Sequence, residues 1–110
     1  MLKFENNKII MDENDYGLEL PFNLSGDVKE KDKIEFIIKE NLCLKQHILK
    51  KEYENCKYED GVLSFNLSFT KEESELLHEG KYVYVLKQYR GESFLNTIKK
   101  DGIFEVEKGC

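Results

Sequence analysis

The sequence predicts an all-β fold, an antiparallel sandwich of seven or eight strands with one short helix. Turn signals recur at short intervals between runs of alternating apolar and polar residues, which is typical of all-β domains. The clearest run, residues 62–69, follows Asp60-Gly61 and has the period of two expected of a strand with one buried side. Its apolar residues are Leu63, Phe65, Leu67 and Phe69. A short helix and a long strand follow, and this order of elements is the connectivity of an immunoglobulin-like sandwich.

Four strands are expected before this run. The first covers residues 8–11 and the third covers 34–39, where apolar residues occupy every second position. The second, 18–24, contains Pro21, which cannot donate to a strand ladder, so we expect this strand at a sheet edge or a break in pairing there. Residues 47–53 fit a strand or a short helix, and we favour the strand.

A short helix is expected over about residues 71–79, in the crossover before the strand that contains Tyr82. Its start is a capping box, in which the Thr70 hydroxyl accepts from the Glu73 amide and the Glu73 carboxylate reaches back. Gly80 is expected to end the helix in the left-handed conformation. The Leu76-Leu77 pair is expected to anchor the helix against an open end of the sandwich.

Two turn signals organise the C-terminal part of the chain. A strand over residues 81–89 is expected to turn at Arg90-Gly91-Glu92 into a strand over 93–98. A second Asp-Gly pair, Asp101-Gly102, predicts a tight turn into residues 103–106, because both central residues of such a turn need positive φ. The long strand and the final hairpin are expected to share one sheet.

Tyr82 has a specific structural interpretation. A glycine two residues before a tyrosine at the start of a late strand resembles the tyrosine corner of immunoglobulin-like domains, whose hydroxyl bonds to upstream backbone. The acidic residue usual four positions earlier is His78 here, and Tyr84 stands where antibody domains keep a cysteine. The disulfide-bearing antibody type is therefore excluded.

Size and charge restrict the class of protein. The chain has 110 residues, so residues 1–110 are read as a single domain. Its net charge is −5 and it has no Lys/Arg cluster, which argues against nucleic-acid binding because that affinity starts with phosphate neutralisation. No apolar run approaches a membrane span of about 20 residues, and the N-terminus shows no signal-peptide pattern. We expect a protein kept in the cytoplasm, without membrane contact.

The cysteines predict free thiols. There are three, an odd number, and their spacing is unlike that of metal sites. Cys43 lies between two leucines and is expected in or near the core, while Cys110 is the last residue. A zinc site built from these thiols and His47 lacks the Cys-x-x-Cys pairs of structural zinc sites.

No other motif predicts a chemical site. The loop 12–17 resembles the start of a calcium loop, but Tyr16 and Asn23 stand where oxygen ligands are required, so a polar turn is favoured. His47 and His78 are the only histidines, and a position near the helix C-terminus is enough to explain His78. We expect no enzyme activity, no catalytic residue, no cofactor and no metal.

Three tyrosines are candidates for an exposed surface: Tyr53, Tyr58 and Tyr89. Tyrosine is enriched at protein interfaces, and half-buried sheet positions explain these residues equally well. If the three form one exposed strip, a ligand-binding module of the carbohydrate-binding type becomes the alternative function, although the chain has no Trp.

The order of these signals resembles the immunoglobulin-like N-terminal domain of siphophage baseplate upper proteins, and related small prophage proteins of low-GC Gram-positive bacteria. The resemblance spans roughly residues 7–107 and includes the segments Asn-Asp-Tyr-Gly (14–17), Asp-Lys-Ile-Glu-Phe-Ile-Ile-Lys (32–39) and Asp-Gly-Val-Leu-Ser-Phe-Asn-Leu-Ser (60–68). Further matching residues are Leu77, Gly80, Tyr82, Tyr84, Thr97, Ile98, Gly102, Phe104 and Val106. Baseplate proteins continue into further domains, which this sequence does not contain.

This resemblance implies a non-enzymatic structural or interaction module of a phage or prophage tail or baseplate assembly. Such a module would dock through sheet edges or a Tyr-bearing face onto other tail or baseplate proteins, and homo-oligomers would be expected. It would be found in the bacterial cytoplasm during assembly, and in the virion if the phage is functional.

Overall fold

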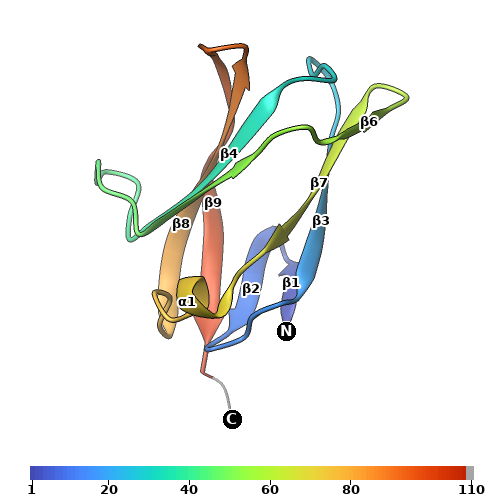
Figure 1. The fold of residues 1–110 in the computed structure, drawn as a ribbon. Coiled ribbons are helices and arrows are strands. Elements are labelled where there is room, and N and C mark those ends of the chain that lie inside the picture. Colours follow the sequence, from blue (N-terminus) through green and yellow to red (C-terminus); the bar gives the residue numbers. More distant parts are fainter. Residues whose placement is uncertain (109–110) are drawn as a thin grey trace.

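Two β-sheets pack face to face in the computed structural model, which describes residues 1–108, and the predicted all-β sandwich is confirmed (Figure 1). The strands of the larger sheet are β1 (Leu2–Glu5), β2 (Lys8–Asp12), β4 (Lys33–Lys39), β5 (Leu49–Tyr53), β8 (Gly80–Arg90) and β9 (Ser93–Glu107). Those of the smaller sheet are β3 (Glu19–Leu24), β6 (Lys57–Glu59) and β7 (Val62–Ser68). The helix α1 (Lys71–Ser74) lies in the connection between β7 and β8.

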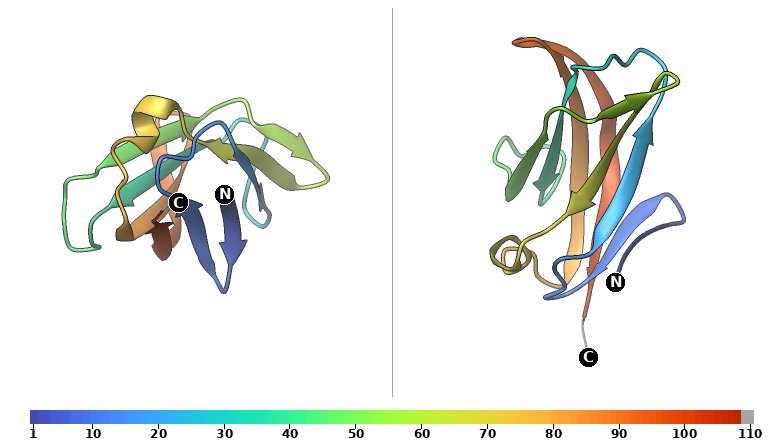
Figure 2. Two further views of the ribbon diagram at one scale, coloured as in Figure 1. Left: turned by 90° about the horizontal axis from the view of Figure 1, so that it is seen from below. Right: turned by 45° about the vertical axis from the view of Figure 1, so that its right-hand side comes forward.

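The strand order is β1-β2-β9-β8-β4-β5 in the larger sheet and β3-β7-β6 in the smaller one. Paired strands are antiparallel except β2 and β9, which run parallel. The chain changes sheet after β2, β3, β5 and β7, which brings β8 between β4 and β9. The right-hand view of Figure 2 shows the two layers. This connectivity is that of an immunoglobulin-like sandwich.

Aromatic rings join the two layers across the core. Phe36 of β4 and Phe104 of β9 are fully buried on the inner face of the larger sheet. Phe22 and Phe65 stack on each other in the smaller sheet, with ring centroids 5.0 Å apart. Phe22 also meets Phe36 edge-on at 6.2 Å, so the two sheets are in direct aromatic contact.

Two sequence predictions about strand placement are confirmed. Pro21 lies opposite Asn66 of β7, and β3 is an edge strand of the smaller sheet. An edge strand has no partner on one side, so it tolerates a residue without a backbone N–H group. The ambiguous segment near residues 47–53 forms the strand β5, paired with β4.

Two short strands, β1 and β6, were not among the predicted ones. β1 pairs with β2 through Asn6 and Asn7, whose φ angles of 53° and 64° are those of a two-residue hairpin turn. β6 pairs with β7 through Asp60 and Gly61, with φ angles of 51° and 75°, so the first Asp-Gly turn is confirmed. Asparagine adopts the left-handed conformation readily, which is why the Asn-Asn pair can turn without glycine.

The second Asp-Gly prediction is wrong. β9 runs without a turn through Asp101 and Gly102 to Glu107, so the segments expected at 93–98 and 103–106 form one strand. Gly102 stands opposite Tyr84 on β8, and a Cβ atom there would lie 2.3 Å from the Tyr84 ring. Gly102 therefore provides space for a buried ring and does not form a turn.

The helix is shorter than predicted. The capping box is present, with Thr70 Oγ1 accepting from the Glu73 amide at 3.2 Å and Glu73 Oε1 accepting from the Thr70 amide at 2.9 Å. However, α1 ends at Ser74, so the expected helix to residue 79 is wrong. Gly80 is not its terminator: it begins β8 with a φ of 149°. Leu77 is buried completely and anchors the crossover, whereas Leu76 is exposed.

The tyrosine corner is confirmed. The Tyr82 hydroxyl accepts from the His78 amide and donates to the His78 carbonyl, both at 3.0 Å. These two bonds satisfy backbone groups of a segment that belongs to neither sheet. The corner therefore fastens the end of the crossover to the start of β8.

We predict that Tyr82→Phe lowers the free energy of unfolding by about 1–2 kcal/mol, because both corner bonds are lost. Tyr53→Phe is the matched control. The Tyr53 hydroxyl is buried without a hydrogen-bond partner among residues 1–108, and burial raises its pKa to about 12. Removing that hydroxyl should leave the stability unchanged or raise it. Urea unfolding monitored by circular dichroism measures both variants, and equal losses would contradict the corner.

We also predict that Gly102→Ala destabilises the protein by about 2 kcal/mol, because the new methyl group overlaps the Tyr84 ring. That ring cannot move freely, since it stacks on Phe36 with centroids 5.3 Å apart. In a Tyr84→Val background, which lacks the ring, Gly102→Ala should cost much less. A double-mutant cycle by urea unfolding tests this, and purely additive losses would show that the contact with the ring is not the cause.

Candidate functional site

One end of the sandwich combines a projecting hairpin, a loop held against that hairpin by side-chain contacts, and an open pocket. The β8–β9 hairpin extends beyond the other strands of its sheet, next to the loop 25–32 that connects β3 to β4 (Figure 1). The connection 54–56 between β5 and β6 lies at the same end, because Glu54 and Asn55 line a pocket together with residues of the hairpin turn. We call this region the loop end.

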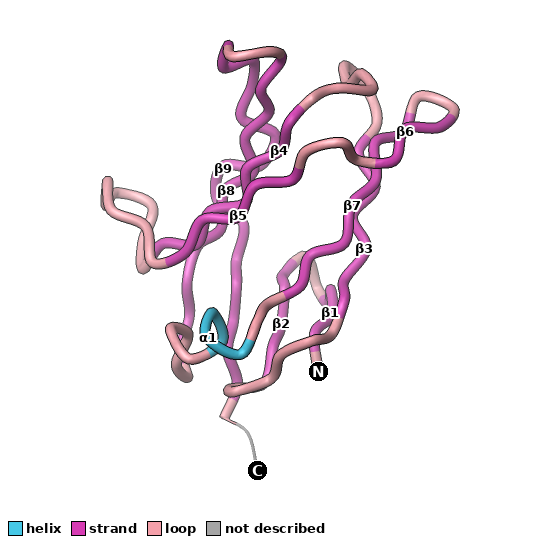
Figure 3. Tube along the Cα trace, in the orientation of Figure 1, coloured by secondary structure: helices cyan, strands magenta, loops and turns pink. Residues whose placement is uncertain are grey.

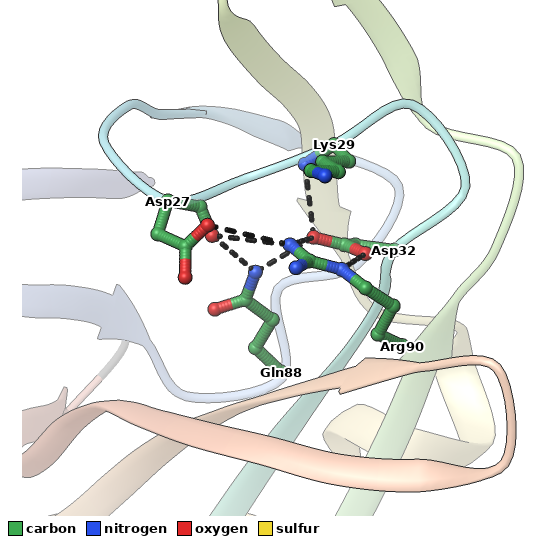
Figure 4. Close-up of polar contacts among 5 residues, drawn as sticks. All are labelled: Asp27, Lys29, Asp32, Gln88 and Arg90. Carbon is green, nitrogen blue, oxygen red and sulfur yellow. Dashed lines mark hydrogen bonds and ion pairs between the residues drawn. The ribbon is translucent and has the colours of Figure 1, made fainter.

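An ion pair between a buried carboxylate and a partly exposed arginine ties the loop to the hairpin. Asp32 is 1% exposed and accepts from Arg90 Nε at its Oδ1 and from Arg90 Nη2 at its Oδ2, each at 2.9 Å (Figure 4). Asp32 precedes β4 and Arg90 ends β8. This bidentate geometry is the strong form of the Arg–carboxylate contact.

Gln88 completes the contact from inside the core. Its amide group donates to Asp32 Oδ2 at 2.7 Å and to the Asp27 carbonyl at 2.8 Å. The Lys29 amide also donates to Asp32 Oδ2, at 2.9 Å. We call Asp32, Gln88 and Arg90 the polar clasp, since together they bind the loop to the base of the hairpin.

The clasp keeps Asp32 ionised. Hydrogen bonds from Arg90, helped by those from Gln88 and the Lys29 amide, hold the pKa of Asp32 at about 2. An acid or base in catalysis needs a pKa close to the working pH and an approachable proton. Asp32 has neither, which indicates a structural role.

The pocket beside the clasp is open and polar. It has a volume of about 440 Å³ and is lined by Lys31, Lys33, Glu54, Asn55, Tyr89, Gly91 and Glu92. Lys33 Nζ lies 5.1 Å from the centroid of the Tyr89 ring, and the Tyr89 hydroxyl donates to Glu35 at 3.3 Å. The cation thus occupies one face of the only aromatic ring that lines this pocket.

Apolar side chains are exposed at the tip of the hairpin. Phe94 is 55% exposed and Leu95 is 40% exposed, immediately after the turn at residues 91–92. Phe94 meets the Tyr89 ring edge-on, with centroids 5.6 Å apart. The hairpin therefore presents an apolar tip next to a charged pocket.

The three tyrosines singled out in the sequence do not form a strip. Tyr53 packs against the core and stacks on Phe65 at 4.6 Å. Tyr58 lies on β6 in the smaller sheet, whereas Tyr89 lies on β8 in the larger one. Of the three, Tyr89 lines the pocket of the loop end.

The cysteine expected in the core is not there. Cys43 is exposed in the loop between β4 and β5, which projects from the side of the sandwich (Figure 3). Its neighbours Leu42 and Leu44 are also exposed, because residues 40–48 form a loop and not a strand of the sandwich. Cys56 is partly buried, and burial raises the pKa of its thiol. Cys110 lies outside the described residues.

The remaining candidates have separate surroundings. Within loop 12–17, the carboxylates of Asp12 and Asp15 pair with the N-terminal amino group. His47 is exposed, and His78 Nδ1 lies 3.9 Å from Glu13. Across residues 1–108, no group of three His, Cys, Asp or Glu side chains is arranged to hold a metal ion. No helix in that range is long and apolar enough to span a membrane.

The polar clasp was not identified from the sequence, although a signal was present. Tyr84, Leu86 and Gln88 occupy alternate positions of one strand, so Gln88 points inward with the other two. A buried amide needs hydrogen-bond partners. That requirement could have predicted a polar contact here, but not the residues that provide it.

Comparisons with protein-family models, with curated proteins and with solved structures found no match to this chain. The resemblance to baseplate upper proteins therefore stays a prediction.

We predict that Asp32→Asn lowers the free energy of unfolding by about 2–4 kcal/mol at neutral pH, because Arg90 and Gln88 lose their shared carboxylate. Asp27→Asn is the matched control, since its side chain is 79% exposed and 3.6 Å from Arg90. That change should cost less than about 0.5 kcal/mol. Urea unfolding measures both, and equal losses would contradict a structural role for the clasp.

The acid sensitivity of the protein should depend on the same carboxylate. The pKa of Asp32 is lower in the folded protein than in the unfolded chain, where it is about 4. Ionised Asp32 therefore stabilises the folded state at pH values above about 4. This contribution is lost as the pH falls from about 4 to about 2. The stability difference between the wild type and Asp32→Asn should therefore narrow over that window, and a constant difference would contradict this assignment.

Proposed function

We propose that this chain is a non-enzymatic interaction module that docks onto a larger assembly through its loop end. The observation that carries the proposal is the apolar tip, Phe94 and Leu95, on a hairpin whose base is held by the polar clasp. Exposed apolar side chains in a charged surrounding are typical of contact sites. A hairpin fixed before binding loses less conformational entropy on docking.

The assembly that we propose is a phage or prophage tail or baseplate, with other tail or baseplate proteins as partners. The order of strand, acidic turn, Gly-x-Tyr-x-Tyr strand and final Gly-x-Phe-x-Val segment supports this proposal by resemblance. Under it, the protein is present in the bacterial cytoplasm during assembly and in the virion if the phage is functional.

Two observations favour docking over the carbohydrate-binding alternative. A sugar-binding platform requires exposed aromatic faces, and Tyr53, Tyr58 and Tyr89 are dispersed. The ring of Tyr89 is already covered on one side by Lys33. Because Lys33 covers one face of the Tyr89 ring, the exposed hairpin tip is the better contact site.

The test is the mass of complexes formed with phage tail and baseplate proteins, measured by light scattering. We predict a complex with at least one of them, and at least a 10-fold weaker Kd after Phe94→Ser with Leu95→Ser. Tyr16→Ser, an exposed aromatic residue in the loop 12–17, is the control and should bind as the wild type does. A protein that binds none of these partners, or hairpin variants that bind normally, would contradict the proposal.

A further inference from the structure

A groove opens at one side of the sandwich, and strands of both sheets contribute to it. It has a volume of about 280 Å³ and is lined by residues of β1, β3, β8 and β9. Its apolar and aromatic side chains are Phe4, Phe22, Leu24, Tyr84, Leu86 and Ile98. We call it the side groove. It reaches the core, because Tyr84 and Leu86 belong to the buried cluster between the sheets.

The strand β9 has a free edge beside this groove. Its neighbour β2 pairs with residues 103–107 and no further, because the chain before Lys8 turns away into β1 (Figure 2). Among residues 1–108, no strand pairs with this side of β9 over residues 93–102. Such an edge presents unpaired N–H and C=O groups, which are a template for another strand.

A β-bulge brings two consecutive side chains of β9 to the side groove. Lys99 stands opposite Leu86 on β8 and Thr97 stands opposite Lys87, so Ile98 is an extra residue in the ladder. Ile98 and Lys99 both line the side groove, although the side chains of a regular strand alternate between its faces. The free edge and the side groove are therefore parts of one surface.

The charge at this surface is positive. Lys99 is the one charged residue in the lining, and it forms no ion pair with any of residues 1–108. The next positions of the free edge hold a second lysine, Lys100, and one acidic residue, Asp101. A carboxylate placed at the side groove would meet an unpaired ammonium group beside apolar side chains, where the attraction is stronger than in open water.

The side groove also contains a hydroxyl group without a partner. Tyr84 is 4% exposed, and its hydroxyl makes no hydrogen bond with residues 1–108. The ring extends over Gly102 of β9, since an added Cβ atom there would lie 2.3 Å from the carbon that carries the hydroxyl. Unlike the Tyr53 hydroxyl, this one is not fully enclosed. Burial raises the pKa of Tyr84, so the group stays protonated and can donate to a ligand.

We propose that an extended peptide segment of a partner protein fills the side groove and pairs as a further strand with residues 97–101 of β9. In this mode of recognition the backbone bonds supply affinity, and alternate side chains enter pockets. The side chains that face the sandwich are apolar, and a carboxylate of the segment meets Lys99. The Tyr84 hydroxyl donates to the same segment.

A peptide fits this surface better than a fatty acid or a similar amphiphile. An amphiphile would fill the groove and pair with Lys99, but it would leave the backbone groups of the β9 edge to water. The other sheet also ends beside the groove, at β3, but Pro21 has no N–H group to donate there, so β9 is the edge that pairs. This site includes neither the hairpin tip nor the polar pocket, so it goes beyond the docking proposed above and does not depend on it.

A library of random peptides of about twelve residues, displayed on yeast and sorted against the whole labelled chain, is the probe. We expect the selected peptides to alternate apolar and polar residues, to carry at least one Asp or Glu, and to lack proline in their central part. A library that yields no binders would overturn the proposal. Binding of dodecanoate in place of any peptide would assign the side groove to amphiphiles and overturn it too.

Charge reversal tests the role of Lys99. Lys99→Glu should weaken the binding of a selected peptide at least about 10-fold, and a new selection against this variant should return peptides with Lys or Arg instead. Lys45→Glu is the matched control, because it makes the same charge change in the exposed loop 40–48, and its Kd should stay within about twofold of the wild type. Equal weakening in the two variants would contradict the site. Circular dichroism verifies folding, and Lys99→Gln replaces a variant that does not fold.

Tyr84→Phe tests the free hydroxyl. It should weaken the peptide about 3-fold to 10-fold, because the hydrogen bond to the segment is lost. The urea midpoint should not fall, since the hydroxyl has no partner among residues 1–108 in the free protein.

Amide hydrogen exchange tests the pairing itself. Those amides of residues 97–101 that exchange fast in the free protein should slow at least about 10-fold when a selected peptide is bound. The amides of β5, the edge strand on the far side of the same sheet, should not change. Peptides that bind without protecting residues 97–101 would rule out strand addition. Phe94→Ser with Leu95→Ser should leave the peptide affinity unchanged, which separates this test from that of the hairpin tip.

Discussion

The inward side chains of β8 provide the contacts on which the rest of this sandwich depends. Tyr82 bonds to the crossover backbone at one end of the strand. Tyr84 stacks on Phe36 in the middle and requires a glycine at position 102. Gln88 reaches the loop before β4 at the other end. A single strand with a period of two therefore fixes a crossover, a neighbouring strand and a loop.

The two ends of the sandwich are held by contacts of different physical kind. The tyrosine corner consists of neutral hydrogen bonds between the Tyr82 hydroxyl and the backbone of His78. The polar clasp depends on an ionised carboxylate whose pKa is held at about 2 by hydrogen bonds from Arg90. Acid therefore weakens the loop end, where the proposed docking surface is located, as the pH falls from about 4 to about 2.

The sequence predicted those features that local patterns determine, and missed those that depend on distant partners. Alternation in residues 62–69 and the Asp60-Gly61 turn are local, and both were right. Asp101-Gly102 is the same pair of residues, but Gly102 is required by the Tyr84 ring on the neighbouring strand β8. A contact between two strands cannot be predicted from the local sequence pattern. The clasp was missed for the same reason, because Asp32 and Arg90 are 58 positions apart in the chain.

The hairpin tip and the body of the larger sheet differ in how the fold supports them. The hairpin tip projects from the sheet, so its orientation depends on the clasp, and a partner there gains from a prearranged hairpin. The body of the larger sheet consists of β4, β8 and β9, where ladder hydrogen bonds fix every position without any clasp. Loss of Asp32 should therefore disturb docking at the tip while the larger sheet keeps its shape.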